Sequence, residues 1–348
     1  MSNLPRVTIA MPAYNEEASL GASLASLQAQ DYPADLIEIL VAEGRSTDGT
    51  RALLARLATA DPRIRVIDNP ARIQAAGLGL IVKEATGDVI VRMDVHCAYA
   101  PDYVRHCVEA LARTGADNVG GAQRARADTP FQHALCAALR SPLGTGGAAY
   151  RDPAAEGDVD TVFLGAFRRR VFETVGLWEP AAITSEDAEL NPRILEAGGG
   201  IFLSRDIVVH DDPRTSVVSL ARQYLRYGRG RARTLLERGR LPTLRPLGPL
   251  LLMSSLAATL LAPPLWPLAP LAFGAYALGT AAEAVRVGRP LGARAVPRVW
   301  MMFPILHASH AAGVATGLVH YLRHRDWVAP ETLAPRRTVL RAVTAPDA

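Results

Sequence analysis

The stretch Val91-Arg92-Met93-Asp94-Val95-His96 decides how the chain is interpreted. It ends an apolar, β-branched run that begins at Asp88, and it leads into an acid and an imidazole two residues apart. In an extended segment such residues point to the same side, so Asp94 and His96 could bind one metal ion together. A carboxylate with a neutral imidazole suits Mn²⁺ better than Mg²⁺. The alternative, in which Asp94 caps a turn and His96 is a surface histidine, stays open because short motifs often match by chance.

Apolar segments and helical patterns alternate on both sides of this stretch. Strands are predicted at residues 6–12, 36–41, 64–67 and 88–93, with helices in the intervals. The alternation predicts an α/β fold whose parallel sheet is covered on both faces. Ligands of such sheets gather at the carboxyl ends of the strands, where three polar loops fall: 12–16, 43–48 and 94–96. Because no GxGxxG follows the first strand, a dinucleotide-binding dehydrogenase fold is disfavoured.

The segment after the fourth strand continues the pattern less regularly. A helix is predicted at 101–113, and further strands are predicted at 118–121, 159–164, 200–203 and 207–209. The glycine- and alanine-rich residues 124–158 are interpreted as a long mobile loop, either a lid or plain disorder.

Ser185, Glu186 and Asp187 mark the start of a further helix. Serine is a good N-cap, and acids in the first turn interact favourably with the helix dipole. This capping role does not exclude catalysis, because a helix that starts at the rim of a pocket also presents its carboxylates to that pocket.

Composition limits the functional class. The 348 residues suffice for about two domains. The net charge of +4 fits a protein near anionic lipid or phosphorylated substrates, but aromatic residues make up only 6%, which disfavours nucleic-acid binding. The three cysteines lack a disulfide or zinc spacing. No apolar signal segment is present at the amino terminus, so the first domain is expected to stay in the cytoplasm.

Apolar sequence concentrates near the carboxyl end. Residues 247–284 are nearly uncharged and too long for one membrane span, and Pro263-Pro264 divides them into a tight pair of helices or a re-entrant hairpin. A third apolar segment covers 299–322, and a strongly basic helix is predicted before all three, at 219–240. We therefore expect a catalytic domain at 1–240, a membrane-associated region of two to three apolar helices at 241–328, and a flexible tail at 329–348.

Five motifs together resemble a known family. They are Pro12-Ala-Tyr-Asn-Glu-Glu17, Glu43-Gly-Arg-Ser-Thr-Asp-Gly49, Asp94-Val-His96, Ser185-Glu-Asp187 and Gln223-Tyr-Leu-Arg-Tyr227. Their order is typical of family 2 glycosyltransferases, and three segments, starting at Asp94, Gly165 and Arg226, resemble the ExoA branch of succinoglycan biosynthesis. The resemblance implies a GT-A nucleotide-diphospho-sugar transferase fold, with a mostly parallel Rossmann-like sheet followed by C-terminal membrane helices.

The resemblance also implies a nucleotide-sugar site with a divalent metal ion, Mn²⁺ or Mg²⁺. The residues that would line the nucleotide sugar are Pro12, Ala13, Tyr14, Glu16, Glu43, Arg72 and Asp94. Glu43 stands where the family usually has aspartate and keeps an acceptor for the base. Asp94 and His96 replace the usual Asp-x-Asp pair, and His210 could approach as a third metal ligand, although it could equally be a loop histidine that caps a turn.

The catalytic roles follow from the same resemblance. Asp187 matches the family's general base, and Glu186 is expected to orient the donor or the acceptor. One displacement with one base inverts the anomeric centre. Gln223, Arg226 and Tyr227 resemble the Gln-x-x-Arg-Trp motif, with Tyr for Trp, which lies over the acceptor or the diphosphate.

These features together predict an inverting hexosyltransferase. It would move a sugar, expected to be glucose, from a UDP-sugar to a polyprenyl-diphosphate-linked saccharide in exopolysaccharide biosynthesis. It would sit at the cytoplasmic (inner) membrane with its catalytic domain facing the cytoplasm. Two alternatives stay open. One is a membrane-anchored nucleotide-sugar-binding subunit without turnover. The other is a small processive polysaccharide synthase, which is disfavoured because the predicted membrane spans are too few to form a channel.

Overall fold

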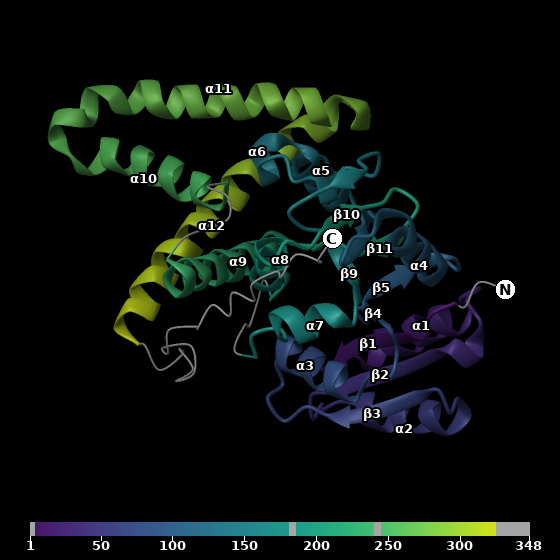
Figure 1. Cartoon of the computed structure of the whole chain (residues 1–348). Coiled ribbons are helices and arrows are strands. Elements are labelled where there is room, and N and C mark those ends of the chain that lie inside the picture. The colour runs from purple at the N-terminus through teal and green to yellow at the C-terminus, as the bar shows by residue number, and fades with distance from the viewer. Residues whose placement is uncertain (1–3, 181–185, 240–244, 325–348) are drawn as a thin grey trace, which may run out of the picture.

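The computed structural model describes residues 4–180, 186–239 and 245–324. Figure 1 shows a sheet domain below and to the right, and a group of long C-terminal helices above and to the left. The first half of the sheet domain has the predicted alternation of strands and helices. Its elements are β1 (Val7–Ala13), α1 (Glu17–Gln28), β2 (Ile37–Glu43), α2 (Thr50–Ala60), β3 (Ile64–Asp68), α3 (Gln74–Glu84) and β4 (Val89–Arg92).

The central sheet has eight strands in the order β3-β2-β1-β4-β9-β6-β10-β8. Its second half consists of β6 (Asn118–Gly121), β8 (Gly157–Asp158), β9 (Phe163–Arg168) and β10 (Ile201–Leu203). Strand β9 is antiparallel to both of its neighbours and β8 is antiparallel to β10, whereas every other neighbouring pair is parallel. The mostly parallel sheet predicted from the sequence is confirmed.

Strand β9 lies four residues later than the predicted strand 159–164. The prediction treated Gly165 as the break after the strand. Gly165 instead adopts a φ of +85° inside it, where glycine permits a local distortion without ending the pairing.

The predicted long loop at 124–158 is wrong. This segment contains the end of β7 (Gln123–Ala125), helix α5 (Pro130–Arg140), the short α6 (Pro142–Thr145) and a 3₁₀ turn at Ala149–Arg151. Helix α5 begins with a capping box between Thr129 and Gln132 and has proline at its first turn, so its start was legible in the sequence. Its apolar face is buried against the C-terminal helices, which stabilises an element that the glycine-rich composition concealed.

A second, smaller sheet joins β5 (Cys97–Tyr99), β11 (Val209–Asp211) and β7, with β11 in the middle. Strand β5 directly follows Asp94-Val95-His96, so this sheet brings residues near 210 next to the end of β4. Helices α4 (Tyr103–Thr114), α7 (Arg170–Val175) and α8 (Glu186–Glu196) complete the sheet domain.

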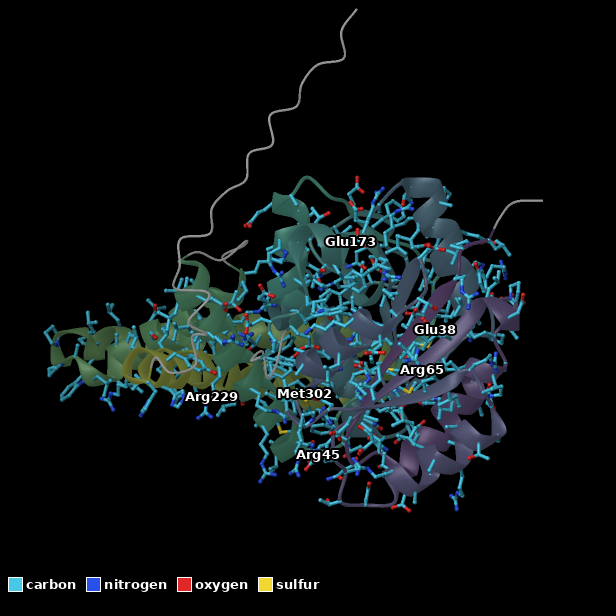
Figure 2. All side chains as sticks on the ribbon, turned by 60° about the horizontal axis from the view of Figure 1, so that its bottom comes forward. Glu38, Arg45, Arg65, Glu173, Arg229 and Met302 are labelled. Carbon is cyan, nitrogen blue, oxygen red and sulfur yellow. The ribbon has the colours of Figure 1, made fainter. Side chains whose placement is uncertain are left out.

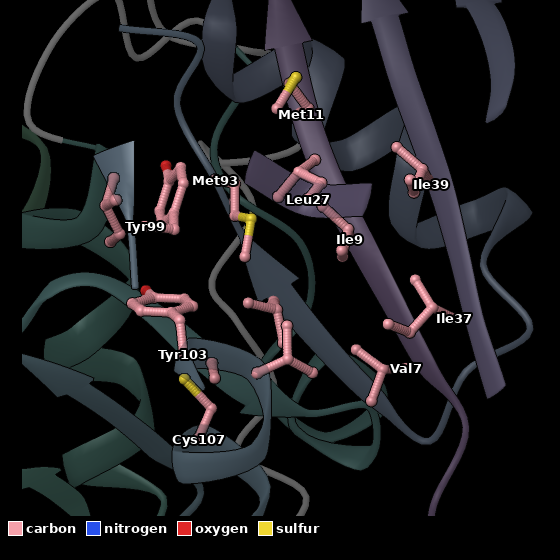
Figure 3. Packing of buried hydrophobic residues seen from close by; sticks show 14 of the residues in the cluster. Val7, Ile9, Met11, Leu27, Ile37, Ile39, Met93, Tyr99, Tyr103 and Cys107 are labelled. Carbon is pink, nitrogen blue, oxygen red and sulfur yellow. The ribbon is translucent and has the colours of Figure 1, made fainter. Parts of the chain in front are cut away.

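The core explains why the strands are apolar along their whole length. Val7, Ile9 and Met11 of β1 pack with Ile37 and Ile39 of β2 on one face of the sheet (Figure 3). Ala10 and Leu40, on the alternate positions, belong to a second buried cluster on the opposite face. Helices therefore cover both faces, as the sequence predicts. The three cysteines are free, and Cys97 and Cys107 are buried.

Four long helices form the C-terminal part: α9 (Val217–Arg238), α10 (Gly248–Leu261), α11 (Ala269–Gly288) and α12 (Val296–Arg323). A 3₁₀ segment, Pro263–Leu268, joins α10 to α11 as a hairpin. The segments Pro263–Leu291 and Ala293–Arg323 are long and apolar enough to cross a membrane. Large apolar side chains are exposed along the hairpin, including Leu261 at 82% and Leu278 at 73%. Figure 2 shows this helical part extending away from the sheet domain, with side chains directed outward.

Helices α9 and α12 pack unusually closely. A Cβ added to Gly313 would lie 2.2 Å from the carbonyl oxygen of Leu225, and one added to Gly228 would lie 2.3 Å from that of His310. Glycine at these positions lets the two backbones touch. Helix α9 is therefore held firmly against α12.

Candidate active site

A cleft of about 140 Å³ lies at the carboxyl ends of the parallel strands. The lining residues are Pro12, Ala13, Tyr14, Glu16, Asn69, Arg72, Ile73, Gln74, Asp94, Val95 and His96. The structure thus brings seven of the predicted site residues together: Pro12, Ala13, Tyr14, Glu16, Arg72, Asp94 and His96. Asn69, Ile73 and Gln74 were not predicted, because they lie in the loop after β3 and at the start of α3, where no motif marks them.

The loops around the cleft are held in uncommon backbone conformations. Asn15, Arg45 and Arg72 all have positive φ, between 55° and 57°. The side-chain oxygen of Asn15 accepts a hydrogen bond from the backbone N–H of Thr47 at 2.8 Å, which ties the first two loops together. Non-glycine residues keep such conformations only where their surroundings impose them, and they cluster at functional sites.

Glu43 does not line the cleft but stabilises the loop that follows β2. Its side chain is 1% exposed and accepts hydrogen bonds from the backbone N–H of Ser46 at 2.6 Å and from Arg51 at 2.9 and 2.6 Å. Burial alone would raise the pKa of Glu43, but the hydrogen bonds from Ser46 and Arg51 outweigh it and leave the pKa below its ordinary value. In this structure the carboxylate fixes the loop that follows β2.

Arg92 connects the carboxylates of the site. It is 4% exposed and forms ion pairs with Asp94 at 3.3 Å, Glu186 at 2.8 Å and Asp187 at 2.7 Å. The sequence motifs did not single out Arg92. A charged residue at the end of an otherwise apolar buried strand was the available signal, since arginine is almost never buried unless it is paired.

Hydrogen bonds hold both the side chain and the backbone of Asp94. Its carboxylate accepts hydrogen bonds from Gln74 at 2.9 Å and from Arg92 at 3.3 Å, and its backbone N–H donates to the hydroxyl of Tyr99 at 2.6 Å. This network fixes the direction of the Asp94 side chain toward the cleft.

Asp187 lies at the start of α8, as predicted, although Ser185 falls outside the described residues. Its carboxylate accepts hydrogen bonds from Arg92 at 2.7 Å and from the indole N–H of Trp178 at 3.3 Å. Burial raises the pKa of Asp187 to about 6; Arg92 lowers it, while the negative charges of Glu186 and Asp94 raise it further. A carboxylate with such a pKa is ionised at neutral pH and is still basic enough to accept a proton.

His96 faces two groups of potential metal ligands. Its Nδ1 lies 4.0 Å from Glu16, and its nearest ligand atom lies within 4.8 Å of both Cys97 and Asp211. The register explains why Asp211 is there: it pairs with Cys97, whereas His210 pairs with Ala98, and successive residues of a strand point to opposite faces. Within the described residues, the structure therefore brings Asp211 to His96 and leaves His210 out of this group.

The motif residues of α9 approach the same region from the other side. Gln223 donates a hydrogen bond to the hydroxyl of Tyr227 at 2.9 Å, and the negative charge of Asp211 contributes to the raised pKa of Tyr227 after the larger effect of burial. Arg226, between them in sequence, is exposed. Tyr227 is thus near enough to Asp211 to be affected by its charge and is hydrogen-bonded to Gln223, whereas Arg226 lies on the surface of α9.

Comparisons with known proteins agree with this geometry. Residues 8–176 match the model of glycosyl transferase family 2. The chain is 36% identical to the succinoglycan biosynthesis protein ExoA of Rhizobium meliloti, over 70% of this chain and 74% of that protein. It is 26% identical to a dolichyl N-acetyl-α-D-glucosaminyl phosphate 3-β-D-2,3-diacetamido-2,3-dideoxy-β-D-glucuronosyltransferase of Methanococcus voltae, over 64% of this chain and 71% of that one.

A solved structure supports the fold. The mannosyltransferase PcManGT of Pyrobaculum calidifontis, solved with GDP-Man and Mn²⁺, has a TM-score of 0.61 at 22% identity, covering 91% of this chain and 88% of that one. The relationship to ExoA, the family match over most of the sheet domain and this common fold lead to one assignment. The chain belongs to the family 2 glycosyltransferases, with a GT-A fold, and is related to enzymes of exopolysaccharide and lipid-linked glycan synthesis.

Proposed function

We propose that the protein transfers a sugar, glucose in the first instance, from a UDP-sugar to a polyprenyl-diphosphate-linked saccharide, with inversion. One observation carries the proposal: Asp187, with its pKa raised to about 6, shares the ion pairs of Arg92 with Asp94, and Asp94 lines the cleft at the strand ends. The relative of Methanococcus voltae, whose name includes a dolichyl-linked sugar phosphate, supports a lipid-linked acceptor, and the similarity to ExoA supports a role in exopolysaccharide biosynthesis.

The donor would lie in the cleft. Pro12, Ala13 and Tyr14 offer a surface for the base and ribose, and Arg72 offers a positive charge for the diphosphate. Glu43 would act indirectly, by holding the loop through Ser46 and Arg51.

The oxygen and imidazole donors around His96 suit Mn²⁺ or Mg²⁺. His96 and Asp211, which lie in one group with Cys97, would hold the ion together with Asp94, which lines the same cleft as His96; Asp211 takes the place considered for His210. A divalent ion bound there would offset the negative charge that develops on the leaving diphosphate.

Asp187 would act as the general base. Its carboxylate takes the proton of the acceptor hydroxyl as the hydroxyl oxygen forms a bond to the anomeric carbon. The bond from that carbon to the diphosphate breaks on the opposite face, and UDP leaves with the bonding electrons. Arg92 positions the base, and Glu186, which shares Arg92, orients the reacting hydroxyls.

The apolar helices would hold the enzyme at the inner face of the cytoplasmic membrane. We propose that residues 1–240 form the catalytic domain and 241–328 the membrane-associated region, within which α10 to α12 expose large apolar side chains. The tail at 329–348 lies outside the described residues.

The test uses full-length protein in detergent. UDP release from UDP-glucose is measured with Mn²⁺, with and without a bacterial lipid extract, and then with other nucleotide sugars. We expect release that requires both the ion and the lipid, and a loss with excess EDTA. If no donor gives release, the protein is a binding subunit without turnover.

Two sets of variants assign the residues. Asp187→Asn should lower transfer by about 10²–10⁴-fold and keep UDP binding, whereas Asp35→Asn, which changes an exposed carboxylate, should do neither. Full activity in Asp187→Asn would remove Asp187 as the base. His96→Ala and Asp211→Asn should raise the Mn²⁺ concentration needed for half-maximal activity, and His210→Ala should leave it unchanged.

A further inference from the structure

Helix α12 is long and apolar enough to cross a membrane, yet its first half is packed on the domain that carries the candidate site. Nε2 of His307, near the middle of the helix, lies 2.8 Å from the carbonyl oxygen of Leu143 in α6. One buried cluster joins α12 to residues of α5 and α9, and its members on α12 are Val299, Met302, Phe303 and Leu306. This half of α12 is therefore part of the protein interior on one side.

The second half of α12 runs along α9. A Cβ added to Gly317 would lie 2.8 Å from the Cβ of Ala232 and 3.0 Å from the Cα of Arg229. Nε of Arg229 lies 3.3 Å from the hydroxyl oxygen of Thr316. Together with the contact at Gly313, these distances show that the two helices lie side by side and are not merely crossing at one point.

Helix α9 carries exposed arginines along the same stretch. Arg222, Arg226 and Arg229 are exposed, and their spacing of four and three residues places them on one face of the helix. Residues 310–317 of α12, which contact α9, lie in the middle of the uncharged stretch between Arg298 and Arg323. If α12 crossed a bilayer, α9 and its arginines would be drawn to the depth of the hydrocarbon, where charged side chains are costly.

The side of α12 that faces away from the protein is an apolar stripe. Its exposed apolar residues recur at intervals of three, four or seven, which keeps them on one face of the helix. They include Met301, Ala308, Ala312, Ala315, Val319 and Leu322. A helix whose other side is occupied by protein and whose free side is an apolar stripe fits the boundary between headgroups and acyl chains.

Arginines gather just before this stripe begins. Arg289, Arg294 and Arg298 lie between the end of α11 and the first turn of α12, and all three are exposed. Within the described residues none of the three forms an ion pair with a carboxylate, whereas the nearby Arg286 is paired with Glu283 at 2.5 Å. Basic side chains beside an apolar helix attract anionic headgroups, so the charge of this turn indicates an anionic bilayer surface.

We propose that α12 lies along the surface of an anionic bilayer and does not cross it. Its stripe rests at the acyl-chain boundary, and Arg289, Arg294 and Arg298 lie among the headgroups. This assignment rests on the membrane attachment in the proposed function and adds the direction in which the helix lies. The hairpin of α10 and α11, with its large exposed apolar side chains, is then the part that enters the hydrocarbon. Both ends of α12 stay on the face of the membrane that carries the catalytic domain.

The first experiment measures depth in the bilayer. Full-length protein with one nitroxide label, at Met301→Cys, Ala308→Cys, Ala315→Cys or Leu322→Cys, is reconstituted into vesicles of phosphatidylcholine and phosphatidylglycerol. Power-saturation EPR gives the depth of each label, and the unsubstituted protein measures labelling of the native cysteines. We expect four shallow and similar depths, with Leu278→Cys in the middle of α11 as the deep reference.

A crossing helix gives a different depth profile. The helix from Met301 to Leu322 is about 30 Å long, which matches the hydrocarbon thickness, so a crossing α12 would place the labels at Ala308 and Ala315 deepest. That profile would overturn the assignment. Protein that fails to float with the vesicles would instead refute the membrane attachment itself.

The charge of the turn is tested with the same label. The combined variant Arg289→Gln, Arg294→Gln and Arg298→Gln should expose the label at position 301 to a water-soluble relaxing agent, as should vesicles of phosphatidylcholine alone. Arg56→Gln, which changes an exposed arginine of α2, is the matched control. An unchanged label in both cases would refute the contact with anionic headgroups.

A second experiment tests sidedness with different variants. Ala293→Cys and His324→Cys flank α12 at exposed positions, and Arg56→Cys marks the catalytic domain. A membrane-impermeant maleimide is applied to intact cells and to inverted membrane vesicles. We expect all three cysteines to react from the same side, whereas reaction of the two flanking cysteines from opposite sides would overturn the assignment. Because no sugar transfer is measured, the assignment holds even if the proposed reaction fails, and the reverse.

Discussion

Arg92 and Arg151 are both drawn into the protein, but their surroundings are opposite. Arg92 lies at the end of β4 with three carboxylates within 3.3 Å. The guanidinium of Arg151 lies 5.1 Å from the centre of the Tyr150 ring, and its Nε has no hydrogen-bond partner in the described structure. The contrast separates an arginine that is fixed by several ion pairs from one that forms none among the described residues.

The largest expected effect is the loss of stability in Arg92→Met. Removing the common cation leaves Asp94, Glu186 and Asp187 as neighbouring buried acids. Breaking a buried ion pair costs about 3–5 kcal/mol. Thermal unfolding of the detergent-solubilised protein, followed by circular dichroism, should show a marked decrease in Tm. An unchanged Tm would mean that Arg92 is no more essential to the fold than Arg151.

A smaller effect is expected where α9 meets α12. The methyl group of Gly313→Ala would collide with the carbonyl of Leu225, so the helices must move apart at a cost of about 1–3 kcal/mol. Sugar transfer should weaken while UDP binding persists, because Gln223 and Tyr227 belong to α9 and no residue of that helix lines the cleft. Gly279→Ala is the control, since nothing lies within 4 Å of that position. Equal behaviour of the two variants would show that the contact does not shape the site.

The pH dependence tests the carboxylate side of the comparison. Asp187 must be ionised to accept a proton, so transfer should fall about tenfold per pH unit below its pKa of about 6. Stability depends on this proton in the opposite direction from the transfer rate. The folded state holds this proton more tightly than the unfolded state, so the contribution of Asp187 to stability decreases as pH rises from about 4 to about 6. A rate that is flat from pH 5 to 8 would exclude this group as the base.

The smallest effect is expected from Arg151→Met. Replacing a charge that has no acidic partner with an apolar side chain should change stability by about 1 kcal/mol or less in either direction. Thermal unfolding beside Arg92→Met measures the contrast directly. A destabilisation as large as that of Arg92→Met would reveal that Arg151 supports the fold.

Local signals in the sequence were enough to bring several predicted residues to one cleft. Pro12 lies at the end of β1, Tyr14 follows it, and Asp94 and His96 follow β4; parallel strands bring these ends to one edge of the sheet. The prediction of His210 as a possible third metal ligand depended on the exact register of its strand. A shift of one residue turns a side chain to the opposite face, and the structure brings Asp211 to His96 instead.

Arg92 and Arg151 were harder to predict for a different reason. Their partners lie far away in sequence: Asp187 is 95 residues from Arg92, and the tyrosines around Arg151 come largely from α9. Residues 124–158 were also judged by composition, which hid helix α5 and the turn that carries Arg151. Tertiary packing decides which groups meet a buried charge, so the local signal at the end of β4 could mark Arg92 but not its partners.

The glycine contact between α9 and α12 has a mechanical consequence. With backbones touching at Gly228 and Gly313, this joint leaves little room for a hinge between the helix that borders the catalytic residues and the apolar helix. An acceptor anchored in a bilayer would then be met at a fixed height. Under the proposed function, this joint would hold Asp187 at a set distance from the bilayer, so acceptors whose glycan is much shorter or longer than that distance would be poorer substrates.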